Sequence, residues 1–252
     1  MNFVWLIVYA GLLLMVAGLV LAIKPIHRLR VRRRAQGLKI VAVGGALALV
    51  GFILPAPESR TSRVESRLDE FMPRWQFSES HTMKVAAPPA TVYDAVKKVR
   101  ASEIRLFRAL TWIRRGGRDM SEGILNAGDD KPLIEVAKRG GFAILADDSA
   151  SELVMGTVVV APLHAFDTLR ATVFRANLPP GFAIAAINFR VLPDANGSLV
   201  TTETRVFASS PATKRQFARY WRLIYPGSAL IRRMWLRAIA RRATQKPTAP
   251  RP

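Results

Sequence analysis

The chain has 252 residues, half of them hydrophobic, and its 38 Lys and Arg against 18 Asp and Glu give a net charge of +20. This length allows one domain of ordinary size plus additional segments, and the absence of cysteine excludes disulfides, thiolate metal sites and cysteine nucleophiles. Such a positive charge is typical of nucleic-acid-binding proteins. Here it is concentrated in two acid-free blocks, seven basic residues in 24–39 and eleven in 214–252, so the rest of the chain is nearly neutral.

Residues 3–23 form an uncharged apolar run, FVWLIVYAGLLLMVAGLVLAI. A helix rises about 1.5 Å per residue, so this run is long enough to cross a hydrocarbon core of about 30 Å. The alternative is a cleaved signal peptide. A signal peptide carries its basic residues before the apolar run, whereas here the basic block follows it. We therefore expect a retained transmembrane span.

A second apolar run, residues 40–54, is shorter and ends at Pro55. It predicts a second span, with Lys39 extending its reach by snorkelling. Small residues lie near one face of each run, which allows a close two-helix hairpin over residues 1–55. The alternative is that glycine is simply common in membrane spans. These residues are Gly11 and Gly18 in the first run and Gly44, Ala48 and Gly51 in the second.

The connecting loop, residues 24–39, fixes the expected orientation. Its seven positive charges favour the cytoplasmic side, so both termini and the folded domain are expected outside, in a multi-pass protein of the cell inner membrane. The predicted membrane-surface residues are Arg28, Arg32, Arg33 and Arg34. A reading as a DNA-binding protein conflicts with this topology, so no nucleic-acid partner is expected.

Residues 56–74 are polar and bounded by prolines, which predicts a linker or a stalk with a short helix at 62–71. From residue 75 onward, the composition and spacing of apolar residues predict a series of elements. These are a strand at 75–86, helices at 91–99, 102–114 and 131–138, and strands at 142–147, 152–161 and 169–177.

The clearest pair of strands comes next. Apolar residues alternate through 183–191 and again through 200–206, with the turn sequence DANG at 194–197 between them. The last element is a basic, aromatic helix over 216–243, interrupted by Pro226-Gly227, which either bends it or splits it. Residues 244–252 are expected to form a disordered tail. The order of elements predicts an α+β fold with helices covering one face of an antiparallel sheet.

Three stretches carry a resemblance to a known family: VAAPPATVYDAV, INFRVLPDANGSLVTTETRVFA and FARYWRLIYPGSALIRRMWLRAI. Over residues 75–243 the chain resembles the START-like superfamily of the polyketide cyclase/dehydrase type. The resemblance implies a helix-grip fold, in which a curved antiparallel sheet wraps around a long C-terminal helix and encloses an apolar cavity. Members bind lipids, sterols or other hydrophobic molecules, and some are enzymes.

On a helical wheel, one face of residues 215–242 is apolar and aromatic and the other carries arginines, with Arg232 and Arg242 as exceptions. The apolar face fits a helix gripping a sheet, and the arginine face fits solvent or anionic lipid headgroups. A cavity needs a few polar groups beside apolar walls. The predicted ligand-pocket residues are Asn188, Thr202, Phe217, Tyr220, Trp221, Ile224 and Trp235.

No motif for nucleotide binding or nucleophilic hydrolysis occurs, and the three histidines lack metal-ligand spacing, so neither a cofactor nor a metal is expected. The sequence favours a membrane-tethered domain that binds a hydrophobic ligand, with membrane lipids as further partners. One alternative is a cyclase- or hydrolase-like enzyme acting on such a ligand, with Glu103 or Glu203 as acid or base. Another is a ligand-free, membrane-anchored interaction module.

Overall fold

The computed structural model describes residues 4–25, 33–128, 130–149, 151–162, 174 and 178–245. Its contacts divide the chain into two compact units. The hairpin unit contains residues 1–56 and 215–225, and the sheet unit contains residues 57–214 and 226–252. The C-terminal helix α7 (Pro211–Thr244) therefore supplies residues to both units.

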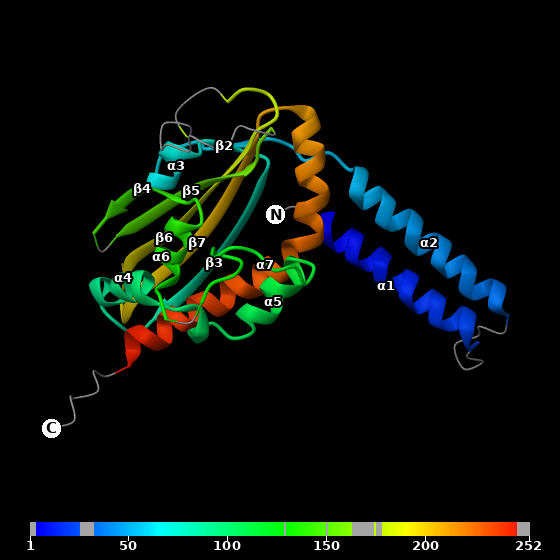
Figure 1. Ribbon diagram of the computed structural model, residues 1–252, viewed down its shortest axis with the longest axis horizontal. Helices are drawn as coiled ribbons and strands as arrows, with labels where there is room; N and C mark the ends of the chain where they lie inside the picture. The colour runs from blue at the N-terminus through cyan, green and yellow to red at the C-terminus, as the bar shows by residue number, and fades with distance from the viewer. Residues whose placement is uncertain are drawn as a thin grey trace. The chain divides into compact units, whose positions relative to one another are not determined.

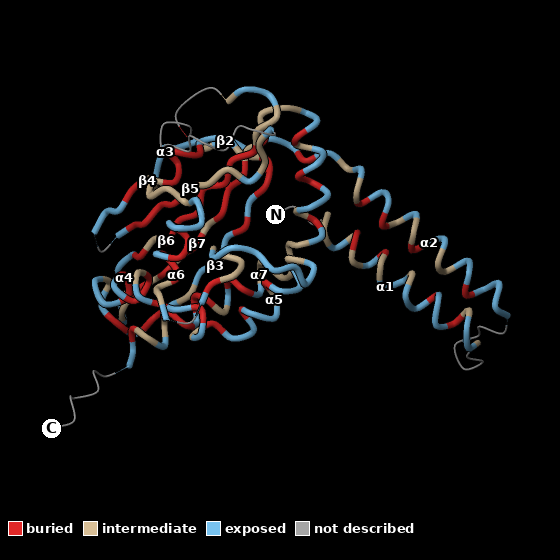
Figure 2. Tube along the Cα trace, viewed as in Figure 1, coloured by how far each residue is buried: buried red, intermediate tan, exposed pale blue. Residues whose placement is uncertain are grey.

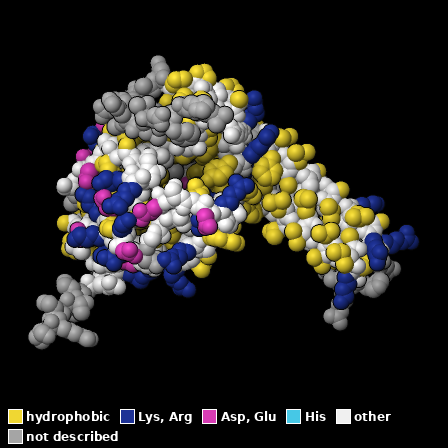
Figure 3. Space-filling view, viewed as in Figure 1, with side chains coloured by type: hydrophobic (Ala, Val, Ile, Leu, Met, Phe, Trp, Pro, Cys, Tyr) yellow, Lys and Arg dark blue, Asp and Glu magenta, His cyan; other side chains and the backbone are white. Residues whose placement is uncertain are grey.

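The hairpin unit is built on two antiparallel helices, α1 (Val4–Ile23) and α2 (Arg34–Ile53). Both are long and apolar enough to cross a membrane. Their outward side chains are exposed and apolar, including Leu13 and Val43, as Figures 2 and 3 show along both helices. A helix that is apolar on its exposed sides is suited to lipid surroundings and unsuited to water.

Glycines at seven-residue spacing form the contact between α1 and α2. A Cβ atom added to Gly11 would lie 2.5 Å from the backbone nitrogen of Ala48, and one added to Gly37 would lie 2.4 Å from that of Ala22. These distances exclude a side chain at either position, so the backbones touch directly. The predicted close hairpin with small residues at its contact is confirmed.

Helix α2 begins at Arg34, six residues before the predicted span. Arginine and glutamine are good helix formers, and no proline interrupts residues 34–39, so the helix continues backward into the basic loop. The second helix therefore has 20 residues, which is about the length that a span requires.

The sheet unit contains five antiparallel strands in the order β3, β7, β6, β5, β4 (Figure 1). The strands are β3 (Phe77–Val85), β4 (Ala143–Asp148), β5 (Glu152–Val160), β6 (Ala183–Asp194) and β7 (Gly197–Ala208). The predicted hairpin is confirmed, with Asp194 paired to Gly197 across the turn. Gly197 has a φ of 144°, a conformation that glycine adopts without strain.

Helices cover one face of the sheet, which we call the inner face. Its apolar side chains, among them Met155, Phe189 and Val191, form one core with α4 (Pro89–Lys98), α5 (Phe107–Arg114), α6 (Leu133–Arg139) and the part of α7 from residue 226 onward. Figure 1 shows these helices on that face. The expected α+β fold with a long C-terminal helix is confirmed.

The opposite, outer face is covered by the segment predicted to be a linker. It contains β1 (Ser59–Arg60), α3 (Arg67–Phe71) and β2 (Arg74–Trp75), and β1 pairs with β2. Leu68, Phe71 and Met72 are buried against Val154 and Ala186 of the sheet. The linker prediction is therefore wrong, because three apolar side chains of this polar segment dock on the sheet. The helix predicted at 62–71 is shorter in the structure, where α3 contains only Arg67–Phe71.

A buried ion pair fixes this segment to the sheet. Arg205 of β7 donates to Asp69 of α3 at 2.7 Å, and both side chains are 8% exposed. Arg205 also pairs with Glu203 and stacks 3.9 Å from the centroid of the Trp75 ring. Asp69 in turn accepts from the backbone N–H groups of Glu65 and Ser66, which caps α3. The buried charge of Asp69 is thus paired within the fold.

The helix predicted at 102–114 needs correction, and the strand predicted at 169–177 falls almost entirely outside the described residues. The single helix expected at 102–114 is a short 3-10 helix, η2 (Ala101–Glu103), followed by α5, because Leu106 between them adopts a left-handed conformation with φ 56°. The strand expected at 169–177 falls on residues outside the described ranges, except Phe174, whose ring lies over Gly156.

The last helix is longer than predicted and is not split. α7 starts at Pro211 after the N-cap Ser210, whose side chain accepts from Thr213 N, and it continues to Thr244 with Pro226 inside it. Most of the expected tail, residues 246–252, lies outside the described ranges.

Candidate functional site

The inner face carries a few polar side chains within an otherwise apolar core. Glu79 and His81 lie two residues apart on β3, so both project from the same face. Glu79 is only 3% exposed. Its Oε1 lies 2.8 Å from His81 Nε2, and its Oε2 accepts at 2.8 Å from Ser228 Oγ of α7. A buried carboxylate therefore joins the edge strand to the last helix.

Arg232 and Trp235 extend this group along α7. Arg232 is 9% exposed and Trp235 is 2% exposed. Among the described residues, neither Arg232 Nη1 nor Trp235 Nε1 has a hydrogen-bond partner, although both atoms are buried. Burial lowers the pKa of the Arg232 guanidinium to about 10, which the charge of Glu79 opposes and the charge of Arg114 reinforces. We call Glu79, His81, Ser228, Arg232 and Trp235 the inner-face cluster.

The surroundings of this cluster are apolar or carry hydroxyl groups. The Trp235 ring packs 4.9 Å from the Phe189 ring, and Ile231 belongs to the same core. Thr204 pairs with Glu79 across β3 and β7, and it is buried. A few polar groups among apolar walls are typical of sites that bind and orient a mostly apolar ligand.

The contacts within the cluster do not form a nucleophilic relay. In such a relay the histidine lies between the serine and the acid. Here Ser228 and His81 both bind the carboxylate of Glu79, so the carboxylate lies in the middle. Within the described ranges, no group of three His, Asp or Glu side chains has the geometry of a metal site. The cluster is suited to binding by hydrogen bonds and charge.

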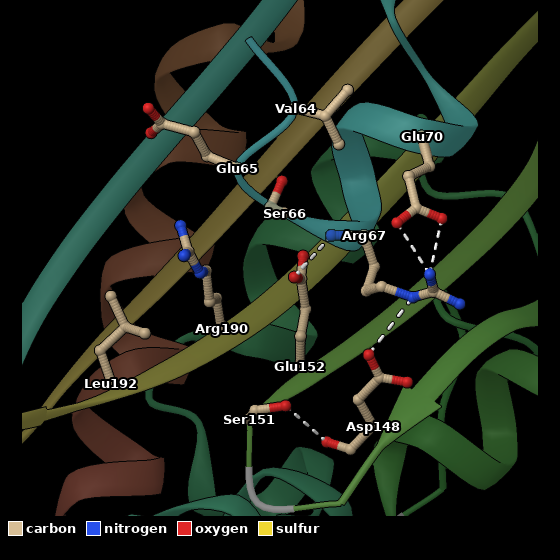
Figure 4. Close-up of a pocket in the computed structure, with 10 residues that line it drawn as sticks. All are labelled: Val64, Glu65, Ser66, Arg67, Glu70, Asp148, Ser151, Glu152, Arg190 and Leu192. Atoms are coloured by element: carbon tan, nitrogen blue, oxygen red, sulfur yellow. Dashed lines mark hydrogen bonds and ion pairs between the residues drawn. The ribbon is translucent and has the colours of Figure 1, made fainter.

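A second polar region lies on the outer face, in an open pocket of about 340 Å³ beside α3 (Figure 4). Glu152, 4% exposed, accepts from the backbone N–H of Arg67 at 2.9 Å and from Asn188 Nδ2 at 2.6 Å. Arg67 pairs in turn with Glu70 and Asp148. These contacts fix the first turn of α3 on the sheet. We therefore infer that the polar residues of this pocket stabilise the fold.

Three of the predicted ligand-pocket residues belong to the sheet unit, on two different faces. Trp235 and Thr202 are buried on the inner side, where the Thr202 hydroxyl donates to the carbonyl of Asn188. The Asn188 side chain lies on the outer face, where it binds Glu152 and the backbone N–H of Glu203. Asn188 therefore cannot share an inner-face site, because neighbouring residues on a strand alternate between faces.

The other four predicted pocket residues, Phe217, Tyr220, Trp221 and Ile224, belong to the hairpin unit. The Phe217 ring contacts those of Tyr220 and Trp221, and Trp221 contacts Tyr225. Tyr225 stacks on Trp5 of α1 with ring centroids 5.2 Å apart. These aromatic residues thus form a cluster at the end of the hairpin where α1 begins.

Arg222 completes this attachment and was not predicted. It is 4% exposed, and its guanidinium donates to the carbonyls of Phe52 at 2.6 Å and Leu54 at 2.5 Å. These carbonyls lie at the C-terminal end of α2, where the helix leaves carbonyl groups unsatisfied. The Tyr9 hydroxyl donates to the carbonyl of Leu223. Residues 215–225 are therefore bound to both helices of the hairpin.

The two carboxylates considered for acid or base chemistry are both in ion pairs. Glu103 pairs with Arg242 at 2.8 Å and accepts from the backbone N–H of Arg100. Glu203 pairs with Arg205 at 2.7 Å on the outer face. The two lie in different parts of the sheet unit, and each contributes to a contact that holds elements together.

Of the predicted membrane-surface arginines, Arg33 is the N-cap residue of α2 and Arg34 is its first residue, both exposed. Arg28 and Arg32 fall outside the described ranges. Figure 3 shows basic side chains at the end of the hairpin where α1 ends and α2 begins.

The inner-face cluster was visible in the sequence only as exceptions to patterns. Glu79 and His81 occupy the positions of β3 that alternate with exposed Ser78 and Ser80. Arg232 is a basic residue on the apolar face of the last helix. Each exception places a polar side chain where an apolar one is expected.

The chain matches no protein-family model and no curated protein sequence. Among solved structures, protein MLL2253 from Mesorhizobium loti aligns with 68% of this chain and 100% of its own length, at 14% identity and a TM-score of 0.33. A TM-score this low does not establish a common fold, so nothing about the function of this chain follows from the likeness.

Proposed function

We propose that this chain is a membrane-anchored protein whose sheet unit binds a hydrophobic ligand of lipid type. The ligand would lie between the inner face of the sheet and residues 226–244 of α7, as in the helix-grip arrangement of the START-like superfamily. The observation that carries the proposal is the inner-face cluster, a set of convergent polar side chains enclosed by apolar residues.

A purely structural core gives little reason for such a group. Burying the Arg232 Nη1 and the indole N–H of Trp235 without a hydrogen-bond partner costs free energy, since each donor loses its hydrogen bond to water. A bound ligand that brings an acceptor removes this cost. The surrounding Phe189, Ile187 and Ile231 supply apolar contact for the rest of the ligand.

The membrane anchor is supported by the hairpin unit. The direct backbone contact of α1 and α2 at Gly11, Gly37 and Gly44 supports a first helix that is retained in the protein. The aromatic residues Trp5 and Tyr225 and the cation Arg222 gather at one end of the hairpin. Tyrosine and tryptophan are enriched where a span meets the headgroup region. We infer that this end lies at the membrane surface.

The orientation follows from the charge of the loop at the other end. Residues 24–39 carry seven positive charges and no acid, which favours retention on the cytoplasmic side. The proposed location is the inner membrane of the cell, with the sheet unit outside the cytoplasm.

Photocrosslinking with a lipid that carries a photoactivatable group in its acyl chain tests the ligand site in the full-length protein. Bulk lipid is expected to label α1 and α2, which provides an internal positive control. The proposal predicts additional, saturable labelling of peptides from β3 and from residues 226–244. Labelling confined to residues 4–53 and 215–225 would instead favour the interaction module without a ligand.

A further inference from the structure

We propose that Arg232 and Trp235 form the binding site for an oxyanion, the carboxylate or phosphate end of an amphipathic ligand. This inference rests on the proposed function and specifies the class of ligand. Its basis is that two buried donors, one of them charged, lie one turn apart on the same side of α7 and lack acceptors among the described residues.

The buried charge of Arg232 favours an anionic ligand. An isolated cation in a protein interior is costly, and it normally has a carboxylate in direct contact or remains at the surface. Arg232 is 91% buried, since its exposed fraction is 9%. Its guanidinium lies 5.4 Å from the centroid of the Trp235 ring, a cation–π contact that offsets part of the cost. This contact does not supply a hydrogen-bond acceptor for Arg232 Nη1.

The only carboxylate that bears on Arg232 among the described residues is already engaged. Glu79 raises the pKa of Arg232 through its charge, but its two oxygens accept from Ser228 and lie against His81. No ion pair within 4.0 Å joins Glu79 to Arg232 in the described part of the chain. The charge of Arg114 also bears on Arg232 and has the same sign. Among the described residues, Arg232 therefore has no carboxylate in direct contact, and an anionic ligand would supply the missing counter-charge.

The Trp235 indole provides a second donor that can bind the same ligand group as Arg232. Residues three apart on a helix lie on the same side, so the Trp235 indole and the Arg232 guanidinium can approach one acceptor group. A carboxylate or phosphate has several oxygens and accepts from both donors at once. An alcohol or ketone offers one oxygen without charge. The donor set therefore favours an acid as the polar end of the ligand, with its apolar chain beside Phe189 and Ile231.

The test compares ligands that differ only in the polar end. Binding of dodecanoate, dodecyl phosphate, dodecanol and inorganic phosphate to the full-length protein in a nonionic detergent is measured by titration calorimetry. For the wild type, we expect dodecanoate or dodecyl phosphate to bind about tenfold or more tightly than dodecanol, because a charge-assisted hydrogen bond is added. Comparing the two acids identifies the headgroup, and tight binding of inorganic phosphate would indicate a free anion.

Arg232→Gln is expected to abolish the preference for the acid, so that dodecanoate and dodecyl phosphate bind no more tightly than dodecanol. Arg233→Gln is the matched control, because it removes the same charge from the adjacent, exposed position of α7. Trp235→Phe keeps a large ring and the charge of Arg232 but removes the Nε1 donor, so it should reduce the preference for the acid over dodecanol. It serves as the second variant if Arg232→Gln does not fold.

The outcomes separate the two proposals. Equal binding of acid and alcohol by the wild type, or a preference that survives Arg232→Gln, overturns the oxyanion site and leaves the hydrophobic-ligand function standing. Binding of none of the four ligands, inorganic phosphate included, overturns both. Tight binding of inorganic phosphate without any amphiphile supports the anion site and contradicts the lipid-type ligand.

Discussion

The Ser228 hydroxyl donates to the Glu79 carboxylate at 2.8 Å, and this hydrogen bond joins α7 to the edge strand β3. Ser228→Ala should therefore loosen the contact and lower the free energy of unfolding by about 1–2 kcal/mol, since a hydrogen bond to a buried charged group is lost. Chemical denaturation followed by near-UV circular dichroism measures this change. Ser80→Ala, at an exposed position of the same strand, should have no effect. Equal effects of the two substitutions would contradict the structural importance of this bond.

The Asp69–Arg205 pair predicts a strong effect on the outer face. Asp69→Asn should destabilise the sheet unit by about 2–3 kcal/mol, because Arg205 stays buried and keeps only Glu203 as a charged partner. Glu70→Gln removes an ion pair whose side chains are 39% exposed and should change stability by less than about 0.5 kcal/mol. The same denaturation experiment compares them. A small effect of Asp69→Asn would mean that the segment docks by its apolar residues alone.

The same residue predicts a dependence on pH. Burial would raise the pKa of Asp69, but the hydrogen bonds from Glu65 N, Arg205 and Ser66 outweigh it and hold the pKa below its ordinary value of 3.8. A carboxyl group with a lowered pKa stabilises the folded state above its ordinary pKa and loses this contribution as the pH falls through the folded-state value. Unfolding measured from pH 5 to pH 2 should show this loss in the wild type. The Asp69→Asn variant should lack that part of the pH dependence.

The hairpin contact predicts that a larger side chain at Gly44 separates α1 from α2. A Cβ atom at Gly44 would lie 2.7 Å from the carbonyl oxygen of Gly11 and 2.7 Å from the backbone nitrogen of Met15. Gly44→Leu should therefore lower the temperature at which the protein unfolds in nonionic detergent, measured by circular dichroism. Gly45→Leu is the control, because a Cβ atom there meets only Met15 Sδ at 3.9 Å. Equal effects of the two substitutions would contradict the contact, and a mature protein that lacks residue 14 by mass spectrometry would show that the first helix is a cleaved signal sequence.

The membrane orientation predicts the location of the C-terminus. A reporter fused after Arg251 should be active outside the cytoplasm, since the basic loop 24–39 holds the other end of the hairpin inside. Replacing the loop arginines by glutamine should weaken or reverse this preference. Cytoplasmic activity of the original fusion would overturn the proposed location of the sheet unit.

Local sequence patterns were sufficient for much of the fold. Alternation and the DANG turn located β6 and β7, and the spacing of Gly11, Gly18 and Gly44 indicated the contact between α1 and α2. These elements are determined by residues close together in the sequence, so they can be predicted from the sequence alone. Leu106 adopts a left-handed conformation that ends the helical pattern of apolar residues. Leucine rarely adopts this conformation, so the residue type does not predict it.

The docking of α3 and the composition of the site depended on distant partners. The segment around Asp69 looks like a solvated linker until Arg205, far along the chain, neutralises its charge. Similarly, Glu79 becomes significant only when Ser228 and Arg232 are brought to its face of the sheet. The aromatic residues Phe217 and Trp221 shared one helical face with Trp235, but the structure assigns them to the hairpin unit. One face of a long helix can therefore serve two different partners.

The most direct test of ligand binding at the inner face uses the fluorescence of Trp235. A variant that keeps Trp235 and replaces the other four tryptophans by phenylalanine is titrated with dodecanoate brominated at successive carbons, because bromine quenches tryptophan only at short range. A second variant, keeping only Trp75 on the outer face, is the control. The account predicts saturable quenching of Trp235, strongest for bromine near the carboxylate, and little quenching of Trp75. Unchanged fluorescence of Trp235, or equal quenching of both, would contradict it.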